Sequence, residues 1–212
     1  MLTPAAPQVA PESNLIEEAK SQNLLILGDS LSAAYGIDQQ QGWVTLLQKK
    51  LREGQKYQAI SVQNASISGE TTSGGKQRLP KLMQRFKPRW LVLELGANDA
   101  LRGQNLHVTQ RNLETMIQSC LRADFECNVM LLGIRLPTNY GPAYEQFLQQ
   151  VYAGLASQYQ LVFDPFFLQA VALDPDLMQP DGLHPNAKAQ PFILQQLWPK
   201  FELLMQNTLV TQ

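Results

Sequence analysis

The residues best suited to catalysis are a serine and a histidine far apart in the chain, Ser30 and His184. A serine hydroxyl is a weak nucleophile until a base removes its proton, and a neutral imidazole can be that base. The imidazole needs a carboxylate at its other nitrogen to hold its tautomer and to stabilise the imidazolium that forms. Asp181 lies three residues before His184, and Gly182 and Pro185 favour a turn that brings the two side chains together. These residue types predict a Ser-His-Asp triad for acyl transfer.

Acyl transfer also requires hydrogen-bond donors for the oxyanion of the tetrahedral intermediate. We expect three donors: the backbone N–H of Ser30 at a helix start, the backbone N–H of Gly69 and the side-chain amide of Asn98. Each residue alone has an ordinary structural interpretation, since Gly69 suits a turn and Asn98 suits the cap of a helix. The combination of types in this order favours an active site.

These residues follow short apolar segments that alternate with amphipathic ones. The apolar segments predict five strands, at 24–27, 57–65, 90–95, 129–132 and 161–163. The segments between and after them predict helices at about 40–53, 71–86, 106–123, 143–159 and 187–206. This alternation predicts an α/β fold with three α/β/α layers and a five-stranded, mostly parallel, flavodoxin-like sheet. Since ligands bind at the carboxyl ends of parallel strands, the predicted catalytic residues should meet at one edge of that sheet.

Length and composition exclude several classes of protein. The chain has 212 residues, which suits one large domain. Its net charge is −1, from 17 basic and 18 acidic residues, whereas a nucleic-acid-binding domain normally has a strong basic excess. No apolar run approaches the roughly 18 residues that span a bilayer, so we expect no integral membrane association. The composition therefore indicates a soluble globular domain.

The two cysteines, Cys120 and Cys127, allow two interpretations. We expect a pair of small, partly buried thiols in preference to a short-loop disulfide, which would require an oxidising compartment. The spacing is not Cys-x-x-Cys, and His107 and His184 are the only histidines, so we expect no metal site and no cofactor. His107 should be an exposed residue at the start of a helix.

The chain is expected to divide into a flexible N-terminal tail, residues 1–22, and one domain, residues 23–206. The tail contains three prolines and little apolar periodicity. It shows no basic segment followed by an apolar one, so no signal-peptide pattern is visible.

Four sequence blocks together resemble the SGNH (GDSL-type) hydrolase family. They read ILGDSLSAAYG, NASISGETTSGG, LELGANDALRG and DGLHPN. The wording is most similar to the bacterial group of acyl-CoA thioesterase I, lysophospholipase L1 and arylesterase enzymes. This resemblance implies a metal-free serine hydrolase of acyl esters and thioesters that is periplasmic or secreted. It also implies that Ser30, Asp181 and His184 are catalytic and that Gly69 and Asn98 belong to the oxyanion hole.

Substrate preference is less constrained by the sequence. By resemblance, Leu136 and Pro137 line the acyl channel; the alternative is an ordinary loop between a strand and a helix. Two other functions remain open: a carbohydrate O-acetyl esterase, and a non-catalytic lipid-binding α/β module. We expect a monomer that acts on a small acyl ester or thioester.

Overall fold

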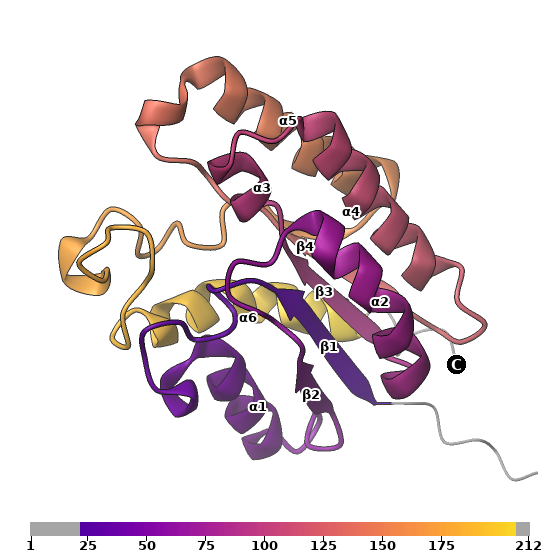
Figure 1. Cartoon of the computed structure of the whole chain (residues 1–212). Coiled ribbons are helices and arrows are strands. Elements are labelled where there is room, and N and C mark those ends of the chain that lie inside the picture. Colours follow the sequence, from indigo (N-terminus) through magenta and orange to yellow (C-terminus); the bar gives the residue numbers. More distant parts are fainter. Residues whose placement is uncertain (1–21, 207–212) are drawn as a thin grey trace, which may run out of the picture.

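The central feature of the computed structural model, which describes residues 22–206, is a five-stranded parallel sheet (Figure 1). The strand order is β2-β1-β3-β4-β5, and every neighbouring pair is parallel. The strands are β1 (Asn23–Gly28), β2 (Ser61–Asn64), β3 (Trp90–Glu94), β4 (Asn128–Leu132) and β5 (Val162–Asp164). The predicted α/β fold is confirmed, and the sheet is wholly parallel within the described residues.

Helices cover both faces of the sheet, which gives three layers (Figure 1). One face carries α1 (Trp43–Glu53) and α6 (Gln190–Gln206), which pack against each other. The other face carries α2 (Thr72–Phe86), α4 (Leu106–Leu121) and α5 (Pro142–Gln158), with α4 between the other two. Short helices lie in the connections: α3 (Ala97–Leu101) and the 3-10 turns η1 (Gln39–Gln41), η2 (Thr138–Tyr140) and η3 (Pro175–Leu177).

The central strands form because their side chains can be buried on both faces. The four residues Leu24 to Leu27 of β1 are completely buried, as are Leu91 to Leu93 of β3. Each such side chain stabilises the fold by about 1.5–3 kcal/mol relative to its exposure to water. These strands therefore fix the position of whatever follows them at their carboxyl ends.

The second strand is shorter than predicted. The apolar pattern placed it at 57–65, but only Ser61–Asn64 pairs with β1. Residues 55–59 form a turn, and the Tyr57 ring packs edge-on against Trp198 of α6 at 6.0 Å between ring centroids. Tyr57 is thus buried by tertiary packing and not by strand pairing, which explains its apolar signal.

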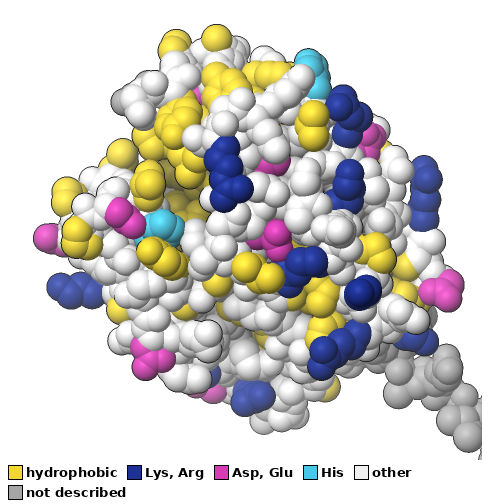
Figure 2. Space-filling view, viewed as in Figure 1, with side chains coloured by type: hydrophobic (Ala, Val, Ile, Leu, Met, Phe, Trp, Pro, Cys, Tyr) yellow, Lys and Arg dark blue, Asp and Glu magenta, His cyan; other side chains and the backbone are white. Residues whose placement is uncertain are grey.

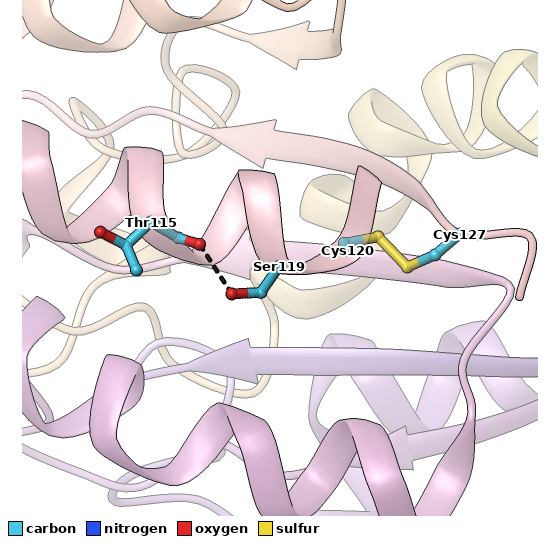
Figure 3. The surroundings of a disulfide bond; sticks show 4 residues. All are labelled: Thr115, Ser119, Cys120 and Cys127. Atoms are coloured by element: carbon cyan, nitrogen blue, oxygen red, sulfur yellow. Dashed lines mark hydrogen bonds between the residues drawn. A yellow bond between two sulfur atoms is a disulfide. The ribbon is translucent and has the colours of Figure 1, made fainter. Parts of the chain in front are cut away.

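The two cysteines form a disulfide, so the preference for free thiols was wrong (Figure 3). Cys120 lies in the last turn of α4 and Cys127 directly precedes β4. The chain reverses between them, which brings their Cα atoms to 5.3 Å, within the range that a disulfide spans. The bond ties α4 to the amino end of the sheet.

Within residues 22–206, no helix is long and apolar enough to cross a bilayer. The predicted N-terminal tail lies outside the described residues, apart from Gln22.

Candidate active site

Ser30 stands in a tight turn at the carboxyl end of β1. The prediction that it begins a helix was wrong: residues 30–35 form turns, and α1 begins only at Trp43. The turn is closed by the Ala33 N–H, which donates to the Asp29 carbonyl at 2.9 Å. The Trp43 indole N–H donates to the Leu31 carbonyl at 3.2 Å, which holds the turn against α1. These contacts present the Ser30 hydroxyl at the sheet edge.

His184 and Asp181 lie beside that hydroxyl in one chain of hydrogen bonds. Ser30 Oγ is 2.9 Å from His184 Nε2, and His184 Nδ1 is 2.6 Å from Asp181 Oδ2. Asp181 Oδ1 accepts the backbone N–H groups of Leu183 and His184, at 2.9 and 3.0 Å. With Nδ1 protonated toward Asp181, Nε2 is free to accept the serine proton. The geometry is that of a nucleophile, a base and an orienting carboxylate.

The Asp181 carboxylate stays ionised over a wide pH range. Its limited burial would raise its pKa, but the hydrogen bonds from the His184 backbone and ring and from the Leu183 N–H outweigh that effect. They hold the pKa of Asp181 at about 2, below the usual 3.8. A permanent negative charge therefore faces the imidazole and favours its protonated form during the reaction.

The predicted oxyanion donors differ in the hydrogen bonds that they make. Asn98 lies inside α3, a helix that the sequence did not predict, and not at the cap of a helix. Its Nδ2 donates to Asp29 Oδ2 at 2.9 Å and to the Glu70 carbonyl at 3.0 Å. Gly69 has a φ of +79°, as expected for a turn glycine. Within residues 22–206, the backbone N–H groups of Ser30 and Gly69 donate no hydrogen bond, so both are available to a ligand.

Two buried carboxyl groups next to the nucleophile were not predicted as functional residues. Asp29 is 1% exposed and Glu94, the last residue of β3, is 2% exposed. Burial raises the pKa of Asp29 from 3.8 to about 6, and burial and the nearby Asp29 raise that of Glu94 well above its usual value. A Cβ on Gly28 would lie 2.6 Å from Glu94 Oε2, so a larger residue there would displace the Glu94 carboxyl group. A glutamate within an apolar strand was the signal that could have revealed this pair.

Hydrogen bonds of Gln179 hold the segment that carries His184 in place. Gln179 Nε2 donates to the Tyr35 carbonyl at 2.8 Å and to the Pro185 carbonyl at 3.1 Å. The Gln179 backbone N–H donates to the His184 carbonyl at 2.7 Å. Gln179 thus joins the turn after the nucleophile to the loop of the base, a role that sequence reasoning missed.

A cavity of about 1070 Å³ opens beside Ser30, Asn98 and His184. Leu136 and Pro137 line it, whereas Gly69 does not. A second wall, which was not predicted, comes from the irregular segment that follows β5. Its lining residues are Pro165, Phe166, Leu168, Gln169, Ala172 and Leu173. Figure 2 shows hydrophobic side chains gathered around a hollow, with a histidine at its edge.

The remaining predictions concern His107 and metal ions. His107 is exposed at the start of α4, as predicted, and its ring packs against Phe147 at 4.8 Å between centroids. In the described part of the chain, no three His, Cys, Asp or Glu side chains are grouped so that they could hold a metal ion.

Comparison with known proteins identifies the family. Residues 26–190 match the model of the GDSL-like lipase/acylhydrolase family. The chain belongs to this family. It is 47% identical to esterase TesA of Pseudomonas aeruginosa over 90% of this chain and 93% of that protein. It is 43% identical to the thioesterase 1/protease 1/lysophospholipase L1 of Escherichia coli over 82% of this chain and 81% of that protein.

Solved structures of family members agree with the fold. The crystal structure of the psychrotrophic esterase EstA from Pseudoalteromonas sp., inhibited by monoethylphosphonate, superposes on this chain with a TM-score of 0.80. It is 38% identical, and the match covers 88% of this chain and all of that chain. The predicted resemblance to GDSL-type hydrolases is therefore confirmed.

Proposed function

We propose that this GDSL-family enzyme is a serine hydrolase of acyl esters and thioesters, with Ser30 as nucleophile, His184 as base and Asp181 as orienting carboxylate. The observation that carries the proposal is the continuous chain of hydrogen bonds from Asp181 through His184 to Ser30, at the opening of a large cavity. A binding module without catalytic activity would have no need for this arrangement.

The reaction follows from the positions of these atoms. His184 Nε2 takes the proton of Ser30 as Oγ bonds to the substrate carbonyl carbon, which leaves a tetrahedral oxyanion. The proposed donors to that oxygen are the Ser30 and Gly69 N–H groups and the Asn98 amide, which would exchange its bond to the Glu70 carbonyl for one to the oxyanion. When the C–O or C–S bond breaks, His184 returns the proton to the departing alcohol or thiol. A water, activated in the same way, then releases the acid and restores Ser30.

The lining of the cavity supports a substrate with an acyl chain. Most of the residues that line this space of about 1070 Å³ are apolar, which suits an acyl chain better than the hydroxyl groups of a sugar, so the cavity argues against a carbohydrate O-acetyl esterase. Hydrophobic residues continue to its rim, where Leu173 is 96% exposed and Leu183 is 42% exposed. An amphiphilic lipid would cover such side chains. The relatives named esterase and thioesterase/lysophospholipase support the same substrate class.

We further propose that the enzyme works in an oxidising compartment, periplasmic or extracellular. What supports this location is the Cys120–Cys127 disulfide, because such bonds persist outside reducing compartments. Mass spectrometry after thiol alkylation of protein taken from its own cells tests the proposal. Two alkylated cysteines would contradict it.

Hydrolysis of p-nitrophenyl esters from acetate to palmitate, by wild type and Ser30→Ala, tests the proposed function. We expect serine-dependent turnover with a maximum at a medium or long chain, and a loss on the order of 10⁴-fold or more in Ser30→Ala. Ser119→Ala, on the surface of α4, is the matched control and should retain full activity. A maximum at acetate would instead favour the deacetylase, and no serine-dependent turnover would contradict the mechanism.

The acyl-binding role of Leu136 has its own test. Leu136→Trp places a larger side chain in the cavity wall and so narrows the cavity. The ester that is hydrolysed fastest should therefore have a shorter acyl chain than in wild type. An unchanged chain-length profile would show that Leu136 does not limit the acyl chain.

A further inference from the structure

The side chain of Asp29, next to the nucleophile, accepts hydrogen bonds on both of its oxygens. Oδ1 accepts the Leu31 backbone N–H at 3.0 Å, which shapes the turn that presents Ser30. Oδ2 accepts the Asn98 amide at 2.9 Å. Asp29 itself is 1% exposed, so water does not replace either contact. One buried carboxylate therefore connects the nucleophile turn with the proposed oxyanion donor.

The contact with Asp29 decides which end of the Asn98 amide faces the nucleophile turn. The Asn98 nitrogen donates to Asp29 Oδ2 and to the Glu70 carbonyl, and both of these partners are acceptors. A flipped amide would place its oxygen against two acceptors, which is repulsive. Without Asp29 only the Glu70 carbonyl would hold the nitrogen end in place.

Glu94, the neighbouring buried carboxyl group, is bonded differently. Its Oε2 alone accepts both the Ser32 hydroxyl, at 2.7 Å, and the Asp29 backbone N–H, at 3.2 Å. A glutamine could accept both bonds with its single carbonyl oxygen, whereas an asparagine at position 29 could keep only one of the two bonds of Asp29. Glu94 does not line the cavity. The pair thus offers two nearly isosteric substitutions with opposite expectations.

From these contacts we propose that Asp29 is a positioning residue that orients the Asn98 amide for the oxyanion, an inference that rests on the proposed function. The amide has two hydrogens, and in the free enzyme Asp29 and the Glu70 carbonyl accept both of them. The oxyanion would take the hydrogen that the Glu70 carbonyl accepts, while the contact with Asp29 keeps the amide in place as charge develops. Loss of the Asp29 contact should therefore lower kcat, while the apolar cavity that binds the acyl chain, and hence KM, stays unchanged.

The test compares Asp29→Asn, Asn98→Ala, the double variant and Glu94→Gln on the preferred p-nitrophenyl ester. We expect kcat to fall about 10²-fold in Asp29→Asn and about 10²–10³-fold in Asn98→Ala, with KM within about threefold of wild type. If Asp29 acts through Asn98, the double variant should be within about threefold of Asn98→Ala. Glu94→Gln, the matched control, should retain kcat within about threefold.

Three controls keep the inference separate from the proposed function and from folding. Thermal unfolding checks each variant. If Asp29→Asn does not fold, Asp29→Ser takes its place, because a serine hydroxyl can still accept the Leu31 N–H but is too short to reach Asn98. Ser30→Ala tests the mechanism itself: activity in that variant would contradict the proposed function. With Ser30→Ala inactive, wild-type kcat in the Asp29 variant, or additive losses in the double variant, would overturn the role of Asp29 alone.

Discussion

The two halves of the triad are built in different ways. Ser30 follows a completely buried strand, and the carboxyl groups beside it, Asp29 and Glu94, are 1% and 2% exposed. Asp181 and His184 lie in a segment without strands or long helices, and their side chains are 39% and 21% exposed. The nucleophile is thus fixed by the hydrophobic core, whereas the base is fixed by a few hydrogen bonds near the surface.

This contrast indicates where the site tolerates change. Deletion of a contact on the core side leaves a buried polar group without a partner, which costs about 1–3 kcal/mol. On the surface side, water can replace a lost partner, so the loss of free energy is small. The main consequence there is that the base is positioned less accurately. Substitutions near Ser30 that delete a buried hydrogen bond should therefore affect folding and catalysis together, and substitutions near His184 should affect catalysis more than folding.

The largest expected effect is on the surface side. His184→Ala removes the base, and kcat should fall on the order of 10⁴-fold or more, because members of a triad act as a unit. Its free energy of unfolding should change little, since the ring is partly exposed. The control in the same ester assay is His107→Ala, which replaces the other histidine of the chain and should retain kcat. A hundredfold loss in His107→Ala would overturn the assignment of the base.

A smaller effect should follow from loosening the loop of the base. Gln179→Ala removes the two hydrogen bonds that join the Tyr35 and Pro185 carbonyls, so kcat should fall about tenfold, a loss of about 1.4 kcal/mol of transition-state stabilisation. KM should stay near the wild-type value, because Gln179 does not line the cavity. Steady-state kinetics of Gln179→Ala measures this loss of kcat. The control is Gln77→Ala, which replaces an exposed glutamine of α2. Wild-type kcat in Gln179→Ala would mean that the loop holds its shape without this clamp.

The two sides should also respond to pH in opposite directions. The pKa of Asp181 is lowered to about 2, so its stabilising contribution is present above the usual 3.8 and is lost as pH falls toward 2. The raised pKa of Glu94 means that the folded state binds the extra proton, so this residue costs stability as pH rises above its usual 4.5. Glu94→Gln removes that cost. Its free energy of unfolding relative to wild type should rise from pH 5 to pH 8, by at most about 1.4 kcal/mol per pH unit.

Urea unfolding at the two pH values measures this change, and Glu53→Gln, an exposed carboxyl group at the end of α1, serves as the control. If the difference in unfolding free energy between Glu94→Gln and wild type does not vary with pH, that result would contradict a raised pKa of the buried Glu94 carboxyl group.

The smallest effect on catalysis is expected at the disulfide, which belongs to neither half of the triad. It lies at the amino end of β4 (Figure 3), whereas the site lies at the carboxyl ends of the strands. The loop spans seven positions, so a Cys120→Ser/Cys127→Ser double variant should lose about 2 kcal/mol of unfolding free energy. Its kcat and KM should match wild type. A clear loss of kcat would show that the two edges of the sheet are coupled.

The sequence predicted the parts of the molecule that depend on local pattern. The buried runs of β1 and β3 located the central strands, and the residue types of the four blocks located Ser30, Asp181 and His184, which the structure brings into contact. The helix α3 was missed because five residues are too short for a periodic signal. The role proposed for Gln179 was missed because it depends on contacts between segments about 144 positions apart.

The disulfide and the second cavity wall could not be predicted for a related reason. Whether Cys120 and Cys127 meet depends on how the chain turns between α4 and β4, and the spacing alone allows both outcomes. The wall after β5 has no helical or strand periodicity, so nothing in its pattern indicated that it faces Ser30.

That wall has a consequence for how the enzyme can diversify. Residues 165–173 lie between β5 and the loop of the base, and only Phe167, Leu168 and Val171 among them belong to the buried core. Changes at the other lining residues therefore leave the strands that carry the nucleophile untouched. Selection can therefore alter the depth or polarity of the pocket one substitution at a time, with little loss of the chemistry. A laboratory library confined to four lining residues of this stretch that are not buried, Phe166, Gln169, Ala172 and Leu173, should yield many folded, active enzymes that differ in the esters they favour.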